Sequence, residues 1–270
     1  MYTLRNKYWP AYTWKIQTSY LKDFKGSLIK DSKISQEEFN ERLSSIFDKI
    51  NASFYHLEKL KENQEIALNL GQMLAKLKMP GMENLPGIAA APYEPISYEY
   101  EAFLVTIKSS LDLITMLISV TFGRGEKDII SLIININRQQ FSEKSPMSEI
   151  YIILQQKEFS NLIQEYKDPN KLENKRSKRN FATHHGSLPI GTTNVPINNP
   201  GASVLLVKPI DHNMPNPDFS SRNTPDLVEY CENHFYLMCD LYIKILSVLL
   251  NNEFKSGSKM SVYEQSKNLK

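Results

Sequence analysis

Hydrophobic residues recur at helical spacing over most of the 270-residue chain. Ser35-Gln36-Glu37-Glu38 has the form of a capping box, in which the serine caps the helix and Glu38 reaches back to it. Apolar positions then follow with a period near 3.6: Phe39, Leu43, Ile46, Phe47, Ile50, Phe54, Leu57 and Leu60. The pattern resumes over 66–77. A single helix over 36–78 would be about 64 Å long, and we expect a break near 61–64.

The second half of the chain predicts further helices. One extends from Ser97 to Thr121, with a buried stripe of Phe103, Ile107, Leu111, Ile114 and Ile118. Gly123-Arg124-Gly125 ends it, and a short helix follows near 127–138. Another opens at Ser145-Pro146 and ends near 167, burying Ile150, Ile153, Leu154 and Ile163. The last helix, capped by Thr224 with Pro225 at its first position, buries Leu227, Tyr230, Phe235, Met238, Leu241, Tyr242, Ile245 and Leu249.

Two stretches interrupt the helical pattern. Residues 80–97 include four prolines and two glycines and predict an extended linker. Residues 187–224 are rich in Pro, Asn, Gly and Ser, and within them 202–209 predicts a strand that pairs with 190–197 in a hairpin. We therefore expect an all-α fold, an up-and-down helical bundle with a small β-hairpin-like insertion before the last helix.

The interruptions also predict the organisation of the chain. An N-terminal helical region occupies 1–79, the linker 80–97, the bundle with its insertion 98–254, and a polar tail 255–270. Near the N-terminus, Trp9, Tyr12, Ile16, Tyr20 and Phe24 recur at helical spacing, which predicts a short packed helix after Pro10 whose aromatic stripe belongs to a core.

Composition narrows the possible classes of function. The net charge of +2 provides no global attraction for nucleic acid, so any such attraction must come from local clusters. Cys231 and Cys239 have no Cys or His partners at zinc-site spacing, which favours reduced thiols in a cytoplasmic protein. The most apolar runs, 111–122 and 241–250, are shorter than the roughly 20 residues that span a bilayer, so we expect no membrane segment.

The strongest local cluster of charge leads into a pair of histidines. The stretch 171–188 holds five basic residues against one acid and then His184 and His185. An arginine can hold a phosphate through its planar fork, and histidine moves a proton most easily near neutral pH. Arg179 and His184 lie a little over one helical turn apart, so they can line one cleft.

The spacing Arg179-Asn180-Phe181-Ala182-Thr183-His184 resembles the motif of the HEPN superfamily, helical-bundle ribonucleases of toxin, phage-defence and RNA-processing systems. The wider resemblance covers roughly 98–250. It implies metal-independent RNA cleavage without a cofactor, catalysed by Arg179 and His184 and supported by Asn180 and His185. It also implies a homodimer with a composite active site and admits an inhibitory protein partner. RNA phosphates would be bound by Lys171, Lys175, Arg176 and Lys178.

Alternatives stay open beside this interpretation. The chain could be a non-catalytic helical module that binds a protein partner or a nucleotide, with the basic stretch as a solvated surface. On the helix over 97–121, Glu101, Lys108 and Asp112 are more simply a solvated ion-paired face, although Asp112 could instead tune the histidine. We expect His56 to be a packing or surface residue and His234 to be structural.

Overall fold

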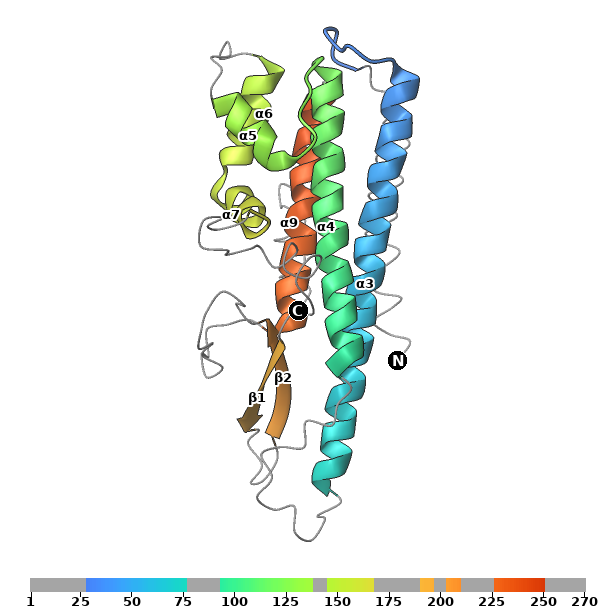
Figure 1. The fold of residues 1–270 in the computed structure, drawn as a ribbon, viewed down its shortest axis with the longest axis vertical. Coiled ribbons are helices and arrows are strands. Elements are labelled where there is room, and N and C mark those ends of the chain that lie inside the picture. Colours follow the sequence, from blue (N-terminus) through green and yellow to red (C-terminus); the bar gives the residue numbers. More distant parts are fainter. Residues whose placement is uncertain are drawn as a thin grey trace, which may run out of the picture. The chain divides into compact units, whose positions relative to one another are not determined.

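The computed structural model describes residues 28–76, 93–137, 145–167, 190–196, 203–209 and 226–250. Figure 1 shows their elements: α3 (Gln36–Lys76), α4 (Tyr93–Thr121), α5 (Ile129–Asn137), α6 (Pro146–Gln155), α7 (Lys157–Glu165), β1 (Ile190–Pro196), β2 (Ser203–Pro209) and α9 (Leu227–Leu249). Helices dominate the described residues, as the predicted all-α class requires. The apolar stripes predicted for α3 and α4 are all buried.

The chain forms two compact units, and the division falls within α3, α4 and α9 rather than at the Pro/Gly-rich stretch. In the unit that contains α5 and α6, the segment before α3 pairs with the ends of two other helices. The backbone N–H of Ile29 donates to Leu249 O at 3.1 Å, and that of Lys33 donates to Thr121 O at 2.9 Å. Because α3 begins where α4 and α9 end, it lies antiparallel to both.

The second unit contains the parts of α3 from Ala52, of α4 up to Lys108 and of α9 up to Phe235. The rings of Phe54 and Phe235 lie 5.6 Å apart, and Lys61 forms an ion pair with Glu232 at 3.1 Å. As α3 advances from 54 to 61, its partners on α9 move back from 235 to 232. The two helices are therefore antiparallel in this unit too.

β1 and β2 form a two-stranded antiparallel sheet in which Ile190 pairs with Pro209 and Pro196 with Ser203. The side chains of this sheet lie outside the described residues. Its place as an insertion in the bundle stays a prediction.

The expected break in the long N-terminal helix is wrong, since α3 continues without interruption from Gln36 to Lys76. Leu57, Leu60 and Gln64 are all buried, so the buried face keeps its helical register through the suspected break. Ion pairs within the helix, Lys59 with Glu62 and Lys61 with Glu58, further support this turn.

The predicted helix over 145–167 is in fact two helices, because Gln156 has an extended ψ of 135°. The Gln156 N–H donates back to Ile153 O, and its side-chain oxygen accepts from Lys244 Nζ of α9 at 2.6 Å. Lys244 Nζ also lies 4.7 Å from the centre of the Phe159 ring. The break changes the direction of the chain, and in the resulting orientation of α7 the side chains of Phe159, Leu162 and Ile163 are buried.

Two helix starts differ from their prediction. α4 begins at Tyr93 rather than Ser97, so the helix takes in the end of the predicted linker. Pro95 lies in its first turn, where a missing N–H breaks no intrahelical bond. α9 begins at Leu227 with Asp226 as a cap, whereas the predicted cap Thr224 and Pro225 lie outside the described residues. Asp226 Oδ1 accepts from the Glu229 N–H at 2.8 Å.

The length and composition of α4 also concern the prediction that the chain has no membrane segment. By length and composition, Pro95–Thr121 could cross a bilayer, although 61% of its most apolar window is buried inside the fold. The burial of α4 is what an apolar core helix requires.

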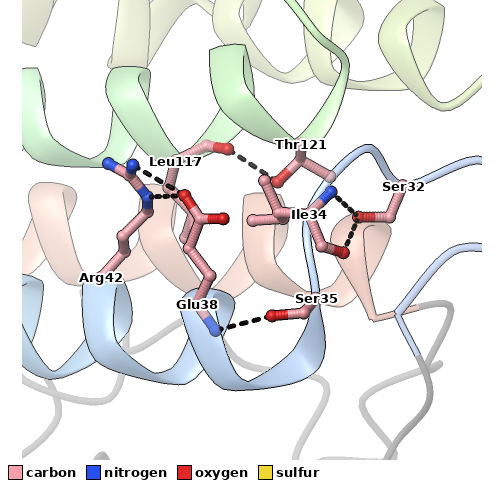
Figure 2. Close-up of polar contacts among 7 residues, drawn as sticks. All are labelled: Ser32, Ile34, Ser35, Glu38, Arg42, Leu117 and Thr121. Carbon is pink, nitrogen blue, oxygen red and sulfur yellow. Dashed lines mark hydrogen bonds and ion pairs between the residues drawn. The ribbon is translucent and has the colours of Figure 1, made fainter.

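The capping box at the start of α3 is only half formed. Ser35 Oγ accepts from the Glu38 N–H at 3.1 Å, as predicted. The Glu38 carboxylate does not return to Ser35 but accepts from Arg42 Nη2 at 2.8 Å, one turn further along the helix (Figure 2). The Ser35 side chain is therefore the only member of the predicted capping box that makes its capping hydrogen bond.

Replacing Ser35 with alanine should lower the free energy of unfolding by about 1 kcal/mol, because one orphan N–H of the first turn loses its acceptor. Urea denaturation followed by helical circular dichroism measures the change. Ser45→Ala is the matched control, since Ser45 is exposed on the same helix and only returns a bond to Glu41 O. An equal loss in both variants would contradict the capping role.

Candidate functional site

The catalytic motif predicted from the sequence lies outside the described residues, as does its basic flank. This applies to Arg179, Asn180, His184 and His185, and to Lys171, Lys175, Arg176 and Lys178. The proposed assignment of these residues to one cleft stays a prediction. Asp112 is the predicted site residue that the structure describes.

Asp112 lies half-buried on α4, where its charge acts on a tyrosine of the core. Burial raises the pKa of Tyr242; the Ser110 hydroxyl opposes this effect, and the nearby Cys239 and Asp112 add to it. The phenol is therefore neutral at physiological pH. Asp112 therefore contributes to the electrostatic environment of Tyr242, and its action on His184 remains a prediction.

The solvated-face interpretation of α4 is wrong for Lys108, which is 9% exposed. Glu101 and Asp112 are half-buried on the same helix. The spacing of seven and four residues correctly places them near one another along the helix, but it could not reveal that neighbouring elements cover Lys108.

A cluster of tyrosines and a histidine lies in the unit that contains β1 and β2. The Tyr230 ring lies 4.1 Å from His234 and 6.2 Å from Tyr100, and Tyr166 lies 6.1 Å from His234. The hydroxyl of Tyr230 donates to Glu165 Oε2 at 3.1 Å. We name these five residues the Tyr–His cluster; Tyr100, Tyr166 and His234 are buried in it.

The chemistry of the Tyr–His cluster is set by burial. Burial raises the pKa of Tyr100 and of Tyr230, and the surrounding groups, Glu165 and Cys231 among them, raise both further. These phenols keep their protons at neutral pH, so they are suited to donate hydrogen bonds rather than to act as bases. His234 is held between rings, in agreement with the structural role expected for it.

Sequence reasoning did not foresee the Tyr–His cluster. The four-residue spacing of Tyr230 and His234 is a helical signal that could have indicated their contact. Tyr100 belongs to α4 and Tyr166 follows directly after α7, and nothing in their local sequence pairs them with α9. Only the packing of α4, α7 and α9 brings the five residues together.

His56 joins α3 to α4 through a polar contact with Glu99. Its Nδ1 lies 2.7 Å from Glu99 Oε2, and the two side chains are 23% and 24% exposed. The expectation of a packing or surface histidine is met, because His56 fastens two helices at the edge of the core.

Within the described ranges, no group of three or more His, Cys, Asp or Glu side chains could hold a metal ion. Both cysteines are buried and free of disulfides. No family model, curated protein or solved structure matches the chain.

Proposed function

We propose that the chain is a metal-independent endoribonuclease of HEPN type, which cleaves RNA by attack of a 2′-hydroxyl on the adjacent phosphate. The observation that carries the proposal is the motif Arg179-Asn180-Phe181-Ala182-Thr183-His184 in a chain whose described part is dominated by helices. The alternative is a non-catalytic helical module that binds a protein or a nucleotide. Absence of RNA cleavage would favour this alternative.

Such a reaction needs a base for the 2′-hydroxyl proton, an acid for the leaving 5′ oxygen and positive charge for the anionic transition state. His184 provides the base or the acid, a contribution of about 10²- to 10⁴-fold. Arg179 provides the charge, because its fork can bind two phosphate oxygens at once. A single Arg–His pair offers one proton-transfer group, whereas the reaction needs both a base and an acid. A homodimer that brings both copies of the motif together would supply the missing group.

The remaining residues have supporting roles in this proposal. Asn180 orients the phosphate or the motif helix, and His185 is the second partner or, if the register differs by one, the catalyst. Asp112 adjusts the histidine, and β1–β2 forms one wall of the cleft. A cytoplasmic toxin or defence enzyme restrained by a protein partner would fit these features.

An RNA-cleavage assay in EDTA tests the proposal. Wild-type protein should cleave single-stranded RNA and leave 2′,3′-cyclic phosphate ends, whereas His184→Ala protein purified in the same way should not. Cleavage that needs a divalent metal, or 5′-phosphate products, would contradict the mechanism. If the wild-type protein cleaves no RNA, the result would favour the non-catalytic binding module.

Salt dependence tests the basic flank separately. Replacing Lys175 and Lys178 with glutamine should weaken RNA binding and lower the slope of log affinity against log salt by about 0.7 for each lost phosphate contact. The measurement is a fluorescence-anisotropy titration of a labelled RNA between low and moderate salt. Lys30→Gln with Lys49→Gln removes the same charge from the exposed surface of the described part and should leave the slope unchanged.

A further inference from the structure

The Tyr–His cluster joins two parts of the chain that are far apart in the sequence. Glu165 is the last residue of α7 and Tyr166 follows it, whereas Tyr230 and His234 lie near the start of α9. The Tyr230 hydroxyl donates to Glu165 Oε2 at 3.1 Å, although the two residues are 65 positions apart. The rings of Tyr166 and His234 lie 6.1 Å apart. We name the hydrogen bond between Tyr230 and Glu165 the clasp.

The predicted ribonuclease residues other than Asp112 lie in the sequence between the two halves of the clasp. Arg179 and His184 do so, as do the basic flank and both strands of the sheet. A chain segment whose two ends are held together has fewer conformations than one whose ends are apart. The clasp therefore restricts the two ends of α7 and α9 that the segment 168–225 connects.

The clasp can be separated from the aromatic packing beneath it. The Tyr230 ring contacts two other rings, that of His234 at 4.1 Å and that of Tyr100 at 6.2 Å. Its hydroxyl meets Glu165, which is exposed. Hydrogen bonds to a carboxylate are stronger than those between neutral groups. Removing the hydroxyl alone therefore removes a strong polar contact and leaves the rings packed.

We propose that the clasp is a positioning contact for RNA cleavage, which acts by holding Glu165 against the start of α9. The proposal rests on the proposed ribonuclease function. Tyr230 and Glu165 act through the chain that joins them to Arg179 and His184, and neither is assigned a contact with RNA. A misplacement of about 1 Å caused by a distant change can cost 10²-fold in rate, so the way the segment is held matters for catalysis.

Amide hydrogen exchange in the full-length protein tests the clasp without RNA. Tyr230→Phe should exchange about fivefold faster around 165–167 and at the start of α9, the effect of losing one hydrogen bond. Exchange in the buried stretch 110–118 of α4 should stay unchanged. Tyr55→Phe is the matched control, because it removes the same hydroxyl from an exposed tyrosine of the same unit.

Steady-state cleavage of a labelled RNA tests the positioning role. Tyr230→Phe should lower kcat about tenfold and change KM less than twofold, because the clasp adds no contact to RNA. Glu165→Leu should have the same effect, whereas Glu165→Gln keeps an oxygen that accepts from Tyr230 and should retain most of the activity. Glu158→Leu is the matched control, an exposed acid at the start of the same helix.

The two measurements separate the possible failures. Unchanged exchange in Tyr230→Phe, or equally faster exchange along all the described helices, would overturn the clasp. Faster exchange at the two ends with an unchanged kcat would overturn the positioning role and leave the ribonuclease proposal standing. A wild-type protein that cleaves no RNA would overturn the ribonuclease proposal and the positioning role together, whatever the exchange shows.

Discussion

Alanine at His184 is expected to lower RNA cleavage by about 10²- to 10⁴-fold, the range typical for loss of a general acid or base. Single-turnover cleavage of a labelled RNA measures this loss against wild type. Thermal unfolding should hardly change if the histidine serves catalysis alone. Unfolding of the variant at ordinary temperature would instead favour a structural role.

Two other histidines make this prediction specific. His185→Ala should retain most of the activity; loss of activity there, with survival in His184→Ala, would move the catalyst by one residue. His56→Ala removes a described histidine that contacts Glu99 and should leave cleavage unchanged. Cleavage that survives in both His184→Ala and His185→Ala would indicate a contaminating nuclease.

Arg179 offers a second variant of the same site. Arg179→Ala should lose about 10²- to 10³-fold in cleavage, the typical effect of removing one donor to the transition state. Arg179→Lys keeps the charge but not the bidentate fork, so it should recover only part of the loss. Full recovery by lysine would show that charge alone matters at this position.

Replacing Arg124 with methionine is expected to lower the free energy of unfolding by about 3–5 kcal/mol, because it leaves a buried carboxylate without its charge partner. The Glu126 side chain is 6% exposed. It accepts hydrogen bonds from Arg124 Nε at 3.1 Å, Ser119 Oγ at 3.1 Å and Asn135 Nδ2 at 3.2 Å. This network fastens the loop after α4 to α5.

Lys127→Met is the matched control for Arg124→Met. It removes the same charge from an exposed position of the same loop, so its effect on urea denaturation should stay within about 0.5 kcal/mol. Equal destabilisation by the two variants would mean that the Arg124–Glu126 contact contributes nothing specific.

The same network predicts how stability depends on pH. Burial alone would raise the pKa of Glu126, but the hydrogen bonds from Arg124 and Asn135 and the arginine charge outweigh it and lower the pKa from 4.5 to about 2. A carboxylate with a lowered pKa stabilises the fold above pH 4.5, and this contribution of about 3 kcal/mol is lost as the pH falls towards 2. Glu126→Gln should flatten the pH dependence of unfolding in that window.

Local sequence was enough to identify the helices and their buried faces. The period of 3.6 placed the apolar positions of two stripes in the core, one from Phe39 to Leu60 and one from Phe103 to Ile118, and every predicted stripe position is buried. This works because burial of an amphipathic face is repeated every turn and is written into neighbouring residues. Ser35 was likewise identified as a cap, since its partner is only three residues away.

Local sequence could not predict the contacts between segments that are distant in the chain. The break at Gln156 depends on Lys244, the burial of Lys108 depends on the elements around α4, and the Tyr–His cluster joins three helices. The Glu38 carboxylate accepts from Arg42 instead of from the Ser35 N–H, because both donors lie within one helical turn of it and compete for the same oxygens. The predicted catalytic motif shows the same division. Its residue types and spacing determine which chemistry is expected, whereas the partners available to Arg179 and His184 depend on tertiary packing, because segments distant in sequence must meet to form a site.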